Sequence, residues 1–389
     1  MQPLEIAAMT AVSALGRGLA AHAAALVDGR SGLRANDFPH IDLACHIGRV
    51  DGLEEGGIEA PFDCRNNRLA SLALATDGFA ERVAACVRRY GSDRVAVVVG
   101  TSTSGILSTE EAYRRRPSPD APLPEFDYRH THDMGSLALY VRSALGLRGP
   151  ASVVSTACSS GAKAFKEGAA LIETGFADAA IVGGTDTLCG TTLYGFASLD
   201  VLDRQPCRPF AADRAGISLG EAAAFALLEP AQGRERVRLE GVGSSVDAHH
   251  MSAPHPEGLG AVLAMRAALE SAGLEPASID YVNAHGTGTR LNDAVEDQAL
   301  VAVFGEDGPW CSSTKGQTGH TLGTAGALEA VLSTLALERG IMPGGAATAG
   351  IDPALRSRVL ARTRSEAPRR VLSNSFGFGG NNCSLVLAI

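Results

Sequence analysis

Residues 152–175 read SVVSTACSSGAKAFKEGAALIETG, a short apolar strand pattern that turns directly into an alanine-rich helix pattern. Cys158 lies at this turn among small residues that leave its sulfur uncrowded. The free N–H groups at the positive end of a helix favour a thiolate and lower the pKa of a cysteine placed there. A lone cysteine is more often a small buried hydrophobe. Cys158 is therefore a candidate nucleophile only if acid–base partners occur elsewhere in the chain.

The same alternation of strand and helix patterns extends along the whole chain. Runs typical of buried strands occur at residues 95–100, 179–184, 222–228, 279–284 and 384–389, and helical patterns at 69–89, 159–175, 261–272 and 324–339. This alternation predicts a layered α/β fold with a largely buried sheet. Glu229, Pro230 and the polar residues 231–236 separate two halves, so we expect domains of residues 1–235 and 236–389.

Composition excludes several classes of function. The 389 residues are 45% hydrophobic, enough for one large core or two fused halves. A formal net charge of -9 makes broad attraction to nucleic acid or to an anionic membrane unexpected. No apolar run reaches the roughly 20 residues of a membrane-spanning helix, and the N-terminus lacks the basic start of a signal peptide. The eight scattered cysteines, with no CxxC pair, predict reduced thiols in a cytoplasmic protein.

Two of the ten histidines lie in loops of glycine and threonine at the apparent ends of elements. His285 occurs in NAHGTGT (283–289) and His320 in KGQTGH (315–320). Ligands of α/β sheets commonly bind at such ends, and neutral imidazole N–H groups there would stabilise negative charge on a thioester oxygen. A metal site is the alternative interpretation. No third ligand follows at a metal-like spacing, so we expect no metal.

A fourth motif, NSFGFGGNN (374–382), precedes the last strand pattern. Its glycines flank Phe376 and Phe378, which predicts a hinge that carries an apolar plug and gates an apolar substrate. The motif lacks the Lys-Ser/Thr ending of a phosphate-binding loop, and no helix follows it.

Taken together, TACSSG, NAHGTGT, KGQTGH and NSFGFGG resemble, in this order, the elongating β-ketoacyl-acyl-carrier-protein synthases of type II fatty-acid and polyketide pathways. The resemblance covers most of the chain, including CRPFAADRAGISLGE (207–221) and SSVDAHHMSAPHPEG (244–258). It implies a thiolase-like five-layered αβαβα fold built from two similar halves, and normally a homodimer. It also implies an enzyme without a cofactor of its own, because the substrate's acyl carrier protein supplies the phosphopantetheine.

The reaction that the resemblance implies is a decarboxylative Claisen condensation. Cys158 would receive the acyl chain as a thioester, while His285 and His320 would hold the malonyl thioester oxygen as carbon dioxide leaves. The enolate carbon would then attack the acyl group. The backbone N–H groups of Cys158 and Phe378 would form the oxyanion hole.

Other residues match supporting positions of the family. Lys315 and Glu329 match a lysine and a glutamate that organise the histidines, with a purely structural buried ion pair as the alternative. The matches to substrate-binding positions are Thr287, Thr289, Phe376 and Phe378. The threonines would receive the phosphopantetheine arm.

An acidic carrier protein requires a basic patch on this acidic chain. By resemblance, the docking residues are Arg65, Arg68 and Arg208. Arg114–Arg116 either extend this patch or form an ordinary solvated charge run.

Departures from the family pattern bear on the pathway and on alternative functions. Gly288 and Arg290 replace a serine and a proline that many fatty-acid members have. They favour a specialised pathway, such as aryl-polyene or another polyketide-like synthesis. A chain-length-determining partner subunit is one alternative, although such subunits typically lack the nucleophile, and a heterodimer with this chain as the active member stays open. A thiolase is the other, but Cys383 lies in NNCSLV rather than in a Cys-Gly-rich loop.

Overall fold

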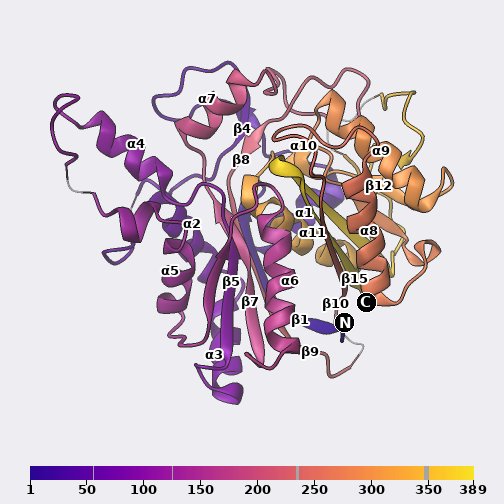
Figure 1. Cartoon of the computed structure of the whole chain (residues 1–389), viewed down its shortest axis with the longest axis horizontal. Helices are drawn as coiled ribbons and strands as arrows, with labels where there is room; N and C mark the ends of the chain where they lie inside the picture. Colours follow the sequence, from indigo (N-terminus) through magenta and orange to yellow (C-terminus); the bar gives the residue numbers. More distant parts are fainter. Residues whose placement is uncertain (56, 125, 234–235, 346–349) are drawn as a thin grey trace.

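Two sheet regions enclose a central layer of helices in the computed structural model, which describes residues 1–55, 57–124, 126–233, 236–345 and 350–389 (Figure 1). The first region has the strand order β6–β5–β7–β9–β1. Its strands are β1 (Leu4–Ser13), β5 (Val95–Gly100), β6 (Ala151–Val154), β7 (Ala179–Asp186) and β9 (Ala222–Pro230). β5 runs parallel to β6 and β7, whereas β9 is antiparallel to β7 and β1.

The second region has the order β10–β15–β14–β11–β12–β13. Its strands are β10 (Arg238–Val246), β11 (Tyr281–Asn283), β12 (Trp310–Ser312), β13 (Arg358–Val359), β14 (Arg370–Gly377) and β15 (Asn381–Ala388). β1 pairs with β10 through Leu4 and Leu239, which joins the two regions. A small separate sheet contains β3 (Arg34–Ala35), β4 (His46–Gly48) and β8 (Leu219–Gly220), and β2 (Gly16–Arg17) pairs with β1.

Helices form the other three layers. The central layer contains α1 (Leu19–Asp28), α6 (Ser160–Glu173) and α11 (Ala325–Arg339). α2 (Arg65–Leu74), α3 (Phe79–Tyr90) and α5 (Ser136–Ala144) cover the outer face of the first region, and α8 (Leu259–Ala272) and α9 (Arg290–Phe304) that of the second. Beyond the strand ends lie α4 (Ile106–Arg114), α7 (Gly190–Ser198) and α10 (Lys315–Thr318). These layers confirm the predicted five-layered αβαβα fold.

The central helices pack so closely because two glycines lie at their crossing. A Cβ atom on Gly161 of α6 would approach Ala327 N to 2.7 Å, and one on Gly326 of α11 would approach Ala162 N to 2.8 Å. α11 is buried on all sides from Ala325 to Leu337, as expected of a helix without a polar face. The close contact between α6 and α11 holds the N-terminal ends of these two helices beside each other. The loops that contain the candidate site residues directly precede these ends.

The predicted strands occur at their expected places, but the helix predicted over residues 69–89 is wrong. The chain instead forms α2 and α3, because Asp77 (φ 59°) and Gly78 (φ 67°) adopt left-handed conformations between them. The Asp77 carboxylate turns to accept the backbone N–H of Leu19 at 3.0 Å. The expected boundary at 235/236 adjoins residues 234 and 235, which lie outside the described part of the chain, and the two-domain division stays a prediction. None of the helices in the described part is long and apolar enough to cross a membrane.

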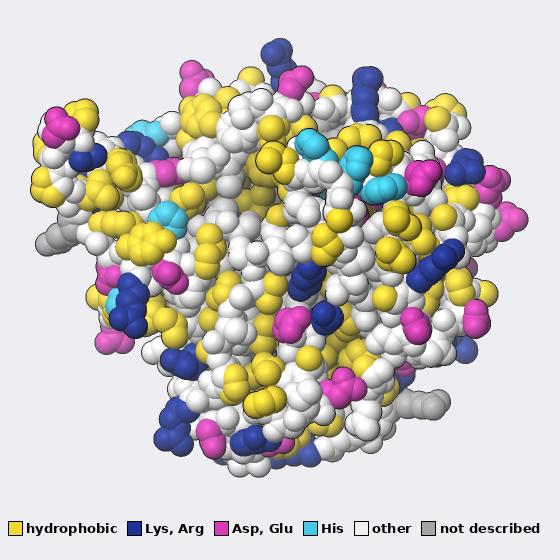
Figure 2. All heavy atoms as spheres, in the orientation of Figure 1, with side chains coloured by type: hydrophobic (Ala, Val, Ile, Leu, Met, Phe, Trp, Pro, Cys, Tyr) yellow, Lys and Arg dark blue, Asp and Glu magenta, His cyan; other side chains and the backbone are white. Residues whose placement is uncertain are grey.

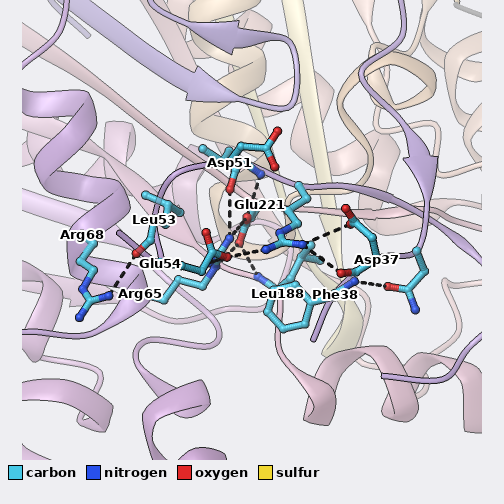
Figure 3. A network of polar contacts seen from close by, with 12 residues as sticks. Asp37, Phe38, Asp51, Leu53, Glu54, Arg65, Arg68, Leu188 and Glu221 are labelled. Atoms are coloured by element: carbon cyan, nitrogen blue, oxygen red, sulfur yellow. Dashed lines mark hydrogen bonds and ion pairs between the residues drawn. The ribbon is translucent and has the colours of Figure 1, made fainter. Parts of the chain in front are cut away.

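A buried ion-pair network fixes the loop before α2 (Figure 3). Arg65 is only 8% exposed, and its guanidinium donates to Glu221 at 2.6 and 3.0 Å and to Glu54 at 2.7 Å. The fully buried Glu221 also accepts the backbone N–H groups of Val50 and Leu188 at 2.8 and 3.0 Å. The prediction that Arg65 docks a carrier protein is therefore wrong, because its charge is already neutralised inside the protein.

Replacing Glu221 with alanine should destabilise the chain by about 3–5 kcal/mol, because it leaves Arg65 as an unpaired buried charge and two backbone N–H groups without an acceptor. Urea denaturation measures this loss of unfolding free energy. Asp178→Ala is the control, since it breaks the exposed Arg94–Asp178 pair (2.8 Å) and should cost much less. Equal losses in the two variants would show that the buried network adds no stability beyond that of a surface pair.

Candidate active site

The three residues singled out from the sequence lie at the carboxyl ends of parallel strands. Cys158 lies between β6 and α6, and His320 lies between β12 and α11, so the two occupy equivalent places in the two halves. His285 follows β11. Because the central helices begin side by side, the loops that precede them meet. The topology thus brings together residues 162 positions apart in the sequence.

A tight turn presents Cys158. Ala157, immediately before it, has a left-handed φ of 51°, a conformation that L-residues with a side chain rarely adopt. Hydroxyl groups secure this turn: Ser159 Oγ donates to Thr156 O at 2.9 Å, and Thr156 N donates to Ser160 Oγ at 2.9 Å. The turn places the sulfur at the start of α6, as the sequence predicted.

The sulfur and the two imidazoles form one cluster. His320 Nε2 lies 3.1 Å from Cys158 Sγ. The His285 and His320 rings are 5.4 Å apart at 86°, and the Phe376 ring lies 5.9 Å from that of His285. All three cluster residues are buried. A thioester on the sulfur would therefore have an imidazole within hydrogen-bonding reach.

Hydrogen bonds determine which nitrogen of each imidazole carries the proton. The backbone N–H of Leu322 donates to His320 Nδ1 at 3.1 Å, so the proton of a neutral ring resides on Nε2. The Lys315 ammonium lies 3.4 Å from His285 Nδ1, which has the same effect on that ring. Both neutral imidazoles can therefore present Nε2–H as a hydrogen-bond donor to an oxygen atom.

The predicted lowering of the Cys158 pKa is wrong. Burial raises the pKa of this thiol to about 11, and it outweighs the opposing effects of the Lys315 charge and of the backbone N–H groups of Phe378 and Cys158. Desolvation of the anion exceeds the helix-end effect because the sulfur is inside the protein. The resting group is thus a thiol, and the transfer of an acyl chain requires a proton acceptor nearby.

Burial lowers the pKa of His285 and of His320 well below the ordinary 6.5, with the Lys315 charge acting in the same direction. We expect both rings to stay neutral as the pH falls through about 6.5, while the histidines of the unfolded chain take up protons there. Unfolding stability should consequently decrease below that pH. NMR titration of the ring protons measures the pKa values of the two imidazoles, with the urea-unfolded chain as control. Titration of both cavity rings near 6.5 would contradict it.

Lys315 and Glu329 form a buried ion pair behind His285. Both are at most 2% exposed, and Lys315 Nζ donates to Glu329 Oε1 and, at 2.6 Å, to the His285 carbonyl oxygen. Burial raises the pKa of Glu329 to about 7, opposed by the lysine charge. The structure therefore unites the predicted pair with His285, although the pair is not exposed to the cavity.

Two further buried carboxylates support the His285 loop and were not singled out from the sequence. Glu296 accepts the backbone N–H groups of His285 (2.8 Å) and Gly286 (2.7 Å), and burial raises its pKa to about 7. Asp293, one helical turn earlier on α9, accepts the Gly288 N–H of this loop at 3.2 Å and the Phe210 N–H at 2.8 Å. Two acids spaced three residues apart on a helix directly after the histidine loop are a signal that could have identified them.

The cluster opens into a mainly apolar cavity of about 140 Å³. Thr287 and Thr289, whose hydroxyls lie 3.0 Å apart, are part of its wall, as are Phe376 and Phe378. Phe378 is 37% exposed and packs 5.7 Å from Phe196. The other lining residues include Val201, Ile217, Asp247, Ser252, Leu291, Asn292 and Asn382. Only residues 378–380 of the predicted glycine hinge leave the strands, since β14 ends at Gly377 and β15 begins at Asn381.

The remaining predicted docking residues are only partly available. Arg68 donates to both oxygens of Asp63 at 2.6 and 2.8 Å, and Arg208 to Asp213 at 2.7 Å. Arg114 lies 3.5 Å from Glu110. In the space-filling view, basic side chains are interspersed with acidic ones and do not merge into one broad patch (Figure 2). Docking by Arg68 and Arg208 stays a prediction.

A metal ion would find three ligand atoms here, although the sequence spacing suggested no third ligand. Cys158 Sγ and one nitrogen each of His285 and His320 lie within 4.8 Å of one another. The Lys315 ammonium, beside His285, opposes a cation at this place. A thiol with two imidazole donors next to a fixed positive charge fits the stabilisation of an anion better than the binding of a metal ion.

Comparisons with known proteins agree on one family. The model described as "Beta-ketoacyl synthase, N-terminal domain" matches residues 1–233, and that described as "Beta-ketoacyl synthase, C-terminal domain" matches residues 237–348. A mitochondrial 3-oxoacyl-acyl-carrier-protein synthase of Arabidopsis thaliana is 39% identical over 64% of the chain, and this alignment spans 58% of the relative. Nodulation protein E of Rhizobium meliloti (strain 1021) is 36% identical, with 86% of both chains covered.

Solved structures are similar over the entire chain. A structure of the ketosynthase ApeO in complex with its chain length factor ApeC, from Xenorhabdus doucetiae, matches with 40% identity and a TM-score of 0.89, covering 100% of this chain and 98% of the other. The ishigamide ketosynthase/chain length factor matches with 27% identity and a TM-score of 0.92, covering 100% and 99%.

Proposed function

Because the chain belongs to the β-ketoacyl synthase family, we propose that it catalyses the decarboxylative Claisen condensation of an acyl thioester with a malonyl carrier protein. One observation carries this proposal: Cys158 Sγ and His320 Nε2, contributed by different halves, lie 3.1 Å apart beside His285 in an apolar cavity. A partner subunit that merely shapes a cavity needs no such arrangement. A thiolase would place a second cysteine in the cavity, and Cys158 is the only cysteine among its described lining residues.

The geometry accounts for each step of the reaction. The Cys158 sulfur attacks the acyl thioester, the bond between the acyl carbon and the phosphopantetheine sulfur breaks, and the thiol proton passes to the departing thiolate. Malonyl thioester then enters along Thr287 and Thr289. The bond between its methylene carbon and its carboxylate breaks, and carbon dioxide leaves. The electron pair of this bond moves into an enolate whose oxygen accepts Nε2–H from His285 and His320.

The enolate carbon finally attacks the acyl carbon on Cys158. The backbone N–H groups of Phe378 and Cys158, which both point toward the sulfur, stabilise the oxyanion of this intermediate. The carbon–sulfur bond then breaks and releases the ketoacyl carrier protein, and the Cys158 thiolate takes up a proton from water to restore the thiol. Lys315 and Glu329 act indirectly, by fixing the His285 loop. No cofactor of the enzyme's own takes part.

A polyketide-like pathway, such as aryl-polyene synthesis, fits the departures at Gly288 and Arg290 better than housekeeping fatty-acid synthesis. The 40% identity to a structure that contains a ketosynthase and its chain length factor supports a heterodimer in which this chain is the active member. A homodimer is the alternative. We further expect the enzyme to act in the cytoplasm, in keeping with eight cysteines that form no disulfide.

Intact-protein mass spectrometry tests the proposed reaction. The chain, alone and coexpressed with a related partner subunit, is incubated with a panel of acyl carrier proteins and then with malonyl carrier protein. The proposal expects an acyl mass on the chain that disappears as ketoacyl carrier protein forms. If no acyl group loads in either preparation, the condensing function is refuted. The size of the loaded species in native mass spectra separates homodimer from heterodimer.

Arg204 is a better candidate for carrier docking than Arg65. It is exposed, takes part in no ion pair with another described residue, and lies three residues after the cavity residue Val201. Arg204→Glu should raise the KM for the acyl carrier protein severalfold without changing kcat, and the difference should shrink at high salt. Arg148→Glu reverses an exposed charge beside Ser92, before the amino end of β5, and is the control. Equal KM values in the two variants would exclude Arg204 from the interface.

A further inference from the structure

The most densely hydrogen-bonded carboxylate near the cavity belongs to Asp186, at the carboxyl end of β7. Its side chain is fully buried. Oδ1 accepts the hydroxyls of Thr101 (2.6 Å) and Thr103 (2.8 Å), and Oδ2 accepts that of Ser102 (2.9 Å). The backbone N–H groups of Ser102 and Thr103 donate at 2.9 Å each. These five donors already outnumber the roughly four acceptor positions of a carboxylate.

A sixth donor comes from the other half of the chain. Gly323 N, between β12 and α11, donates to Asp186 Oδ2 at 2.5 Å. A Cβ atom on Gly323 would lie 2.6 Å from that oxygen and 2.8 Å from Ser102 N, so a side chain does not fit. Asp186 therefore joins the loop that follows β5, in the half with Cys158, to the loop that contains His320.

The bond to Gly323 acts on the His320 ring through one intervening residue. Leu322 has a left-handed φ of 54°, an unfavourable conformation for a residue with a side chain. In this conformation its N–H donates to His320 Nδ1 at 3.1 Å. Among the described residues, this is the only hydrogen bond to that ring nitrogen. The Asp186–Gly323 bond holds the far end of the strained residue and so maintains its orientation.

Other contacts hold the His320 backbone but not its ring. His320 N donates to Ser218 O at 2.7 Å, and Gly220 N donates to His320 O at 3.0 Å. If the Asp186 bond is lost, these contacts keep residue 320 in place while Leu322 relaxes. Nδ1 then loses its donor, and the proton of the neutral ring is free to move from Nε2 to Nδ1. The ring would no longer present Nε2–H to the cavity.

We propose that Asp186 is a positioning residue for decarboxylation: by holding Gly323 and Leu322 it keeps the His320 imidazole in the tautomer that carries its proton on Nε2. This inference rests on the proposed condensing function. It predicts that the two half-reactions respond differently to loss of the carboxylate. Acyl loading uses the Cys158 sulfur, whereas decarboxylation uses the Nε2–H donors.

The experiment measures both half-reactions in Asp186→Asn. The asparagine side chain has nearly the same volume, but its NH₂ group faces the hydroxyl and N–H donors that the carboxylate accepts in the wild type. We expect decarboxylation of malonyl carrier protein to fall at least about 10-fold relative to acyl loading, as expected for an imidazole in the wrong tautomer. The matched control is Asp297→Asn. Asp297 is also a buried aspartate and accepts Ser357 N (2.8 Å) and Arg356 N (3.0 Å), but these partners lie outside the loop that contains His320.

A milder variant and a direct readout keep the test decisive if Asp186→Asn folds poorly. Ser102→Ala removes one donor to Oδ2 and also the second, longer contact of Gly323 N, which lies 3.2 Å from Ser102 Oγ. It leaves the Asp186–Gly323 bond in place and should shift the ratio of half-reactions in the same direction by a smaller factor. Spectra of ¹⁵N-histidine-labelled protein report the His320 tautomer, which should become mixed in both Asp186 and Ser102 variants and stay unchanged in Asp297→Asn. If both half-reactions fall in step and the tautomer is unchanged, the inference is overturned. If the wild type performs neither half-reaction, the proposed function fails instead.

Discussion

Cys158→Ala loses the formation of ketoacyl carrier protein, with a decrease in rate of roughly 10⁴-fold or more, because the acyl chain has no sulfur to bind. The other cysteines cannot substitute, since Cys158 is the only described cysteine in the cavity wall. Thermal stability should change little, because one sulfur atom is removed beside an existing cavity. Product formation with an excess of both carrier-protein substrates measures the loss.

Cys383→Ala is the matched control for this variant. Cys383 is completely buried on β15 and does not line the cavity. Its replacement should lower stability by about 1 kcal/mol, as a typical core substitution does, and leave the rate of condensation within a few-fold of the wild type. Acyl loading on the Cys158→Ala protein at the wild-type rate would identify a different nucleophile.

The second large effect is expected at the Lys315–Glu329 pair. Lys315→Met removes the counter-charge of Glu329, so this buried side chain must take up a proton or remain an unpaired carboxylate, and the His285 carbonyl loses a donor. We expect a loss of about 3–5 kcal/mol of unfolding free energy. The double variant Lys315→Met/Glu329→Gln contains no buried charge at this place. Much of the stability should return, because replacing both partners of a buried pair is often neutral.

Activity should not return with stability in the double variant. The pair holds the His285 loop, and the lysine also keeps His285 Nδ1 supplied with a donor. Urea denaturation and the decarboxylation rate, measured on the wild type, both single variants and the double variant, separate the two roles. Recovery of both quantities together would show that the pair serves stability alone.

Much of the fold and of the site could be predicted from the sequence, because the relevant signals are local. The strands at residues 95–100 and 179–184 read as continuous apolar runs, since a sheet covered on both faces has no polar side. Cys158, His285 and His320 each lie in a loop whose small residues leave room for a ligand, and each loop is directly followed by a helix or preceded by a strand. The helix predicted over 69–89 failed because Asp77 adopts a left-handed conformation to bind Leu19, a residue 58 positions away.

The residues of each motif, and the order in which the motifs occur, are properties of the chain itself, and they are enough to indicate a cysteine nucleophile with two imidazole partners. Burial and long-range hydrogen bonds, in contrast, are properties of the folded structure. The raised pKa of Cys158, the internal neutralisation of Arg65 by Glu221 and the tautomer of His285 beside Lys315 depend on groups that the sequence places far apart. Free energies of desolvation and of hydrogen bonding arise only where the folded chain excludes water and brings a donor within about 3 Å of an acceptor. The role of Asp186 cannot be predicted from the sequence for the same reason, since this residue joins two loops that meet only in the folded protein.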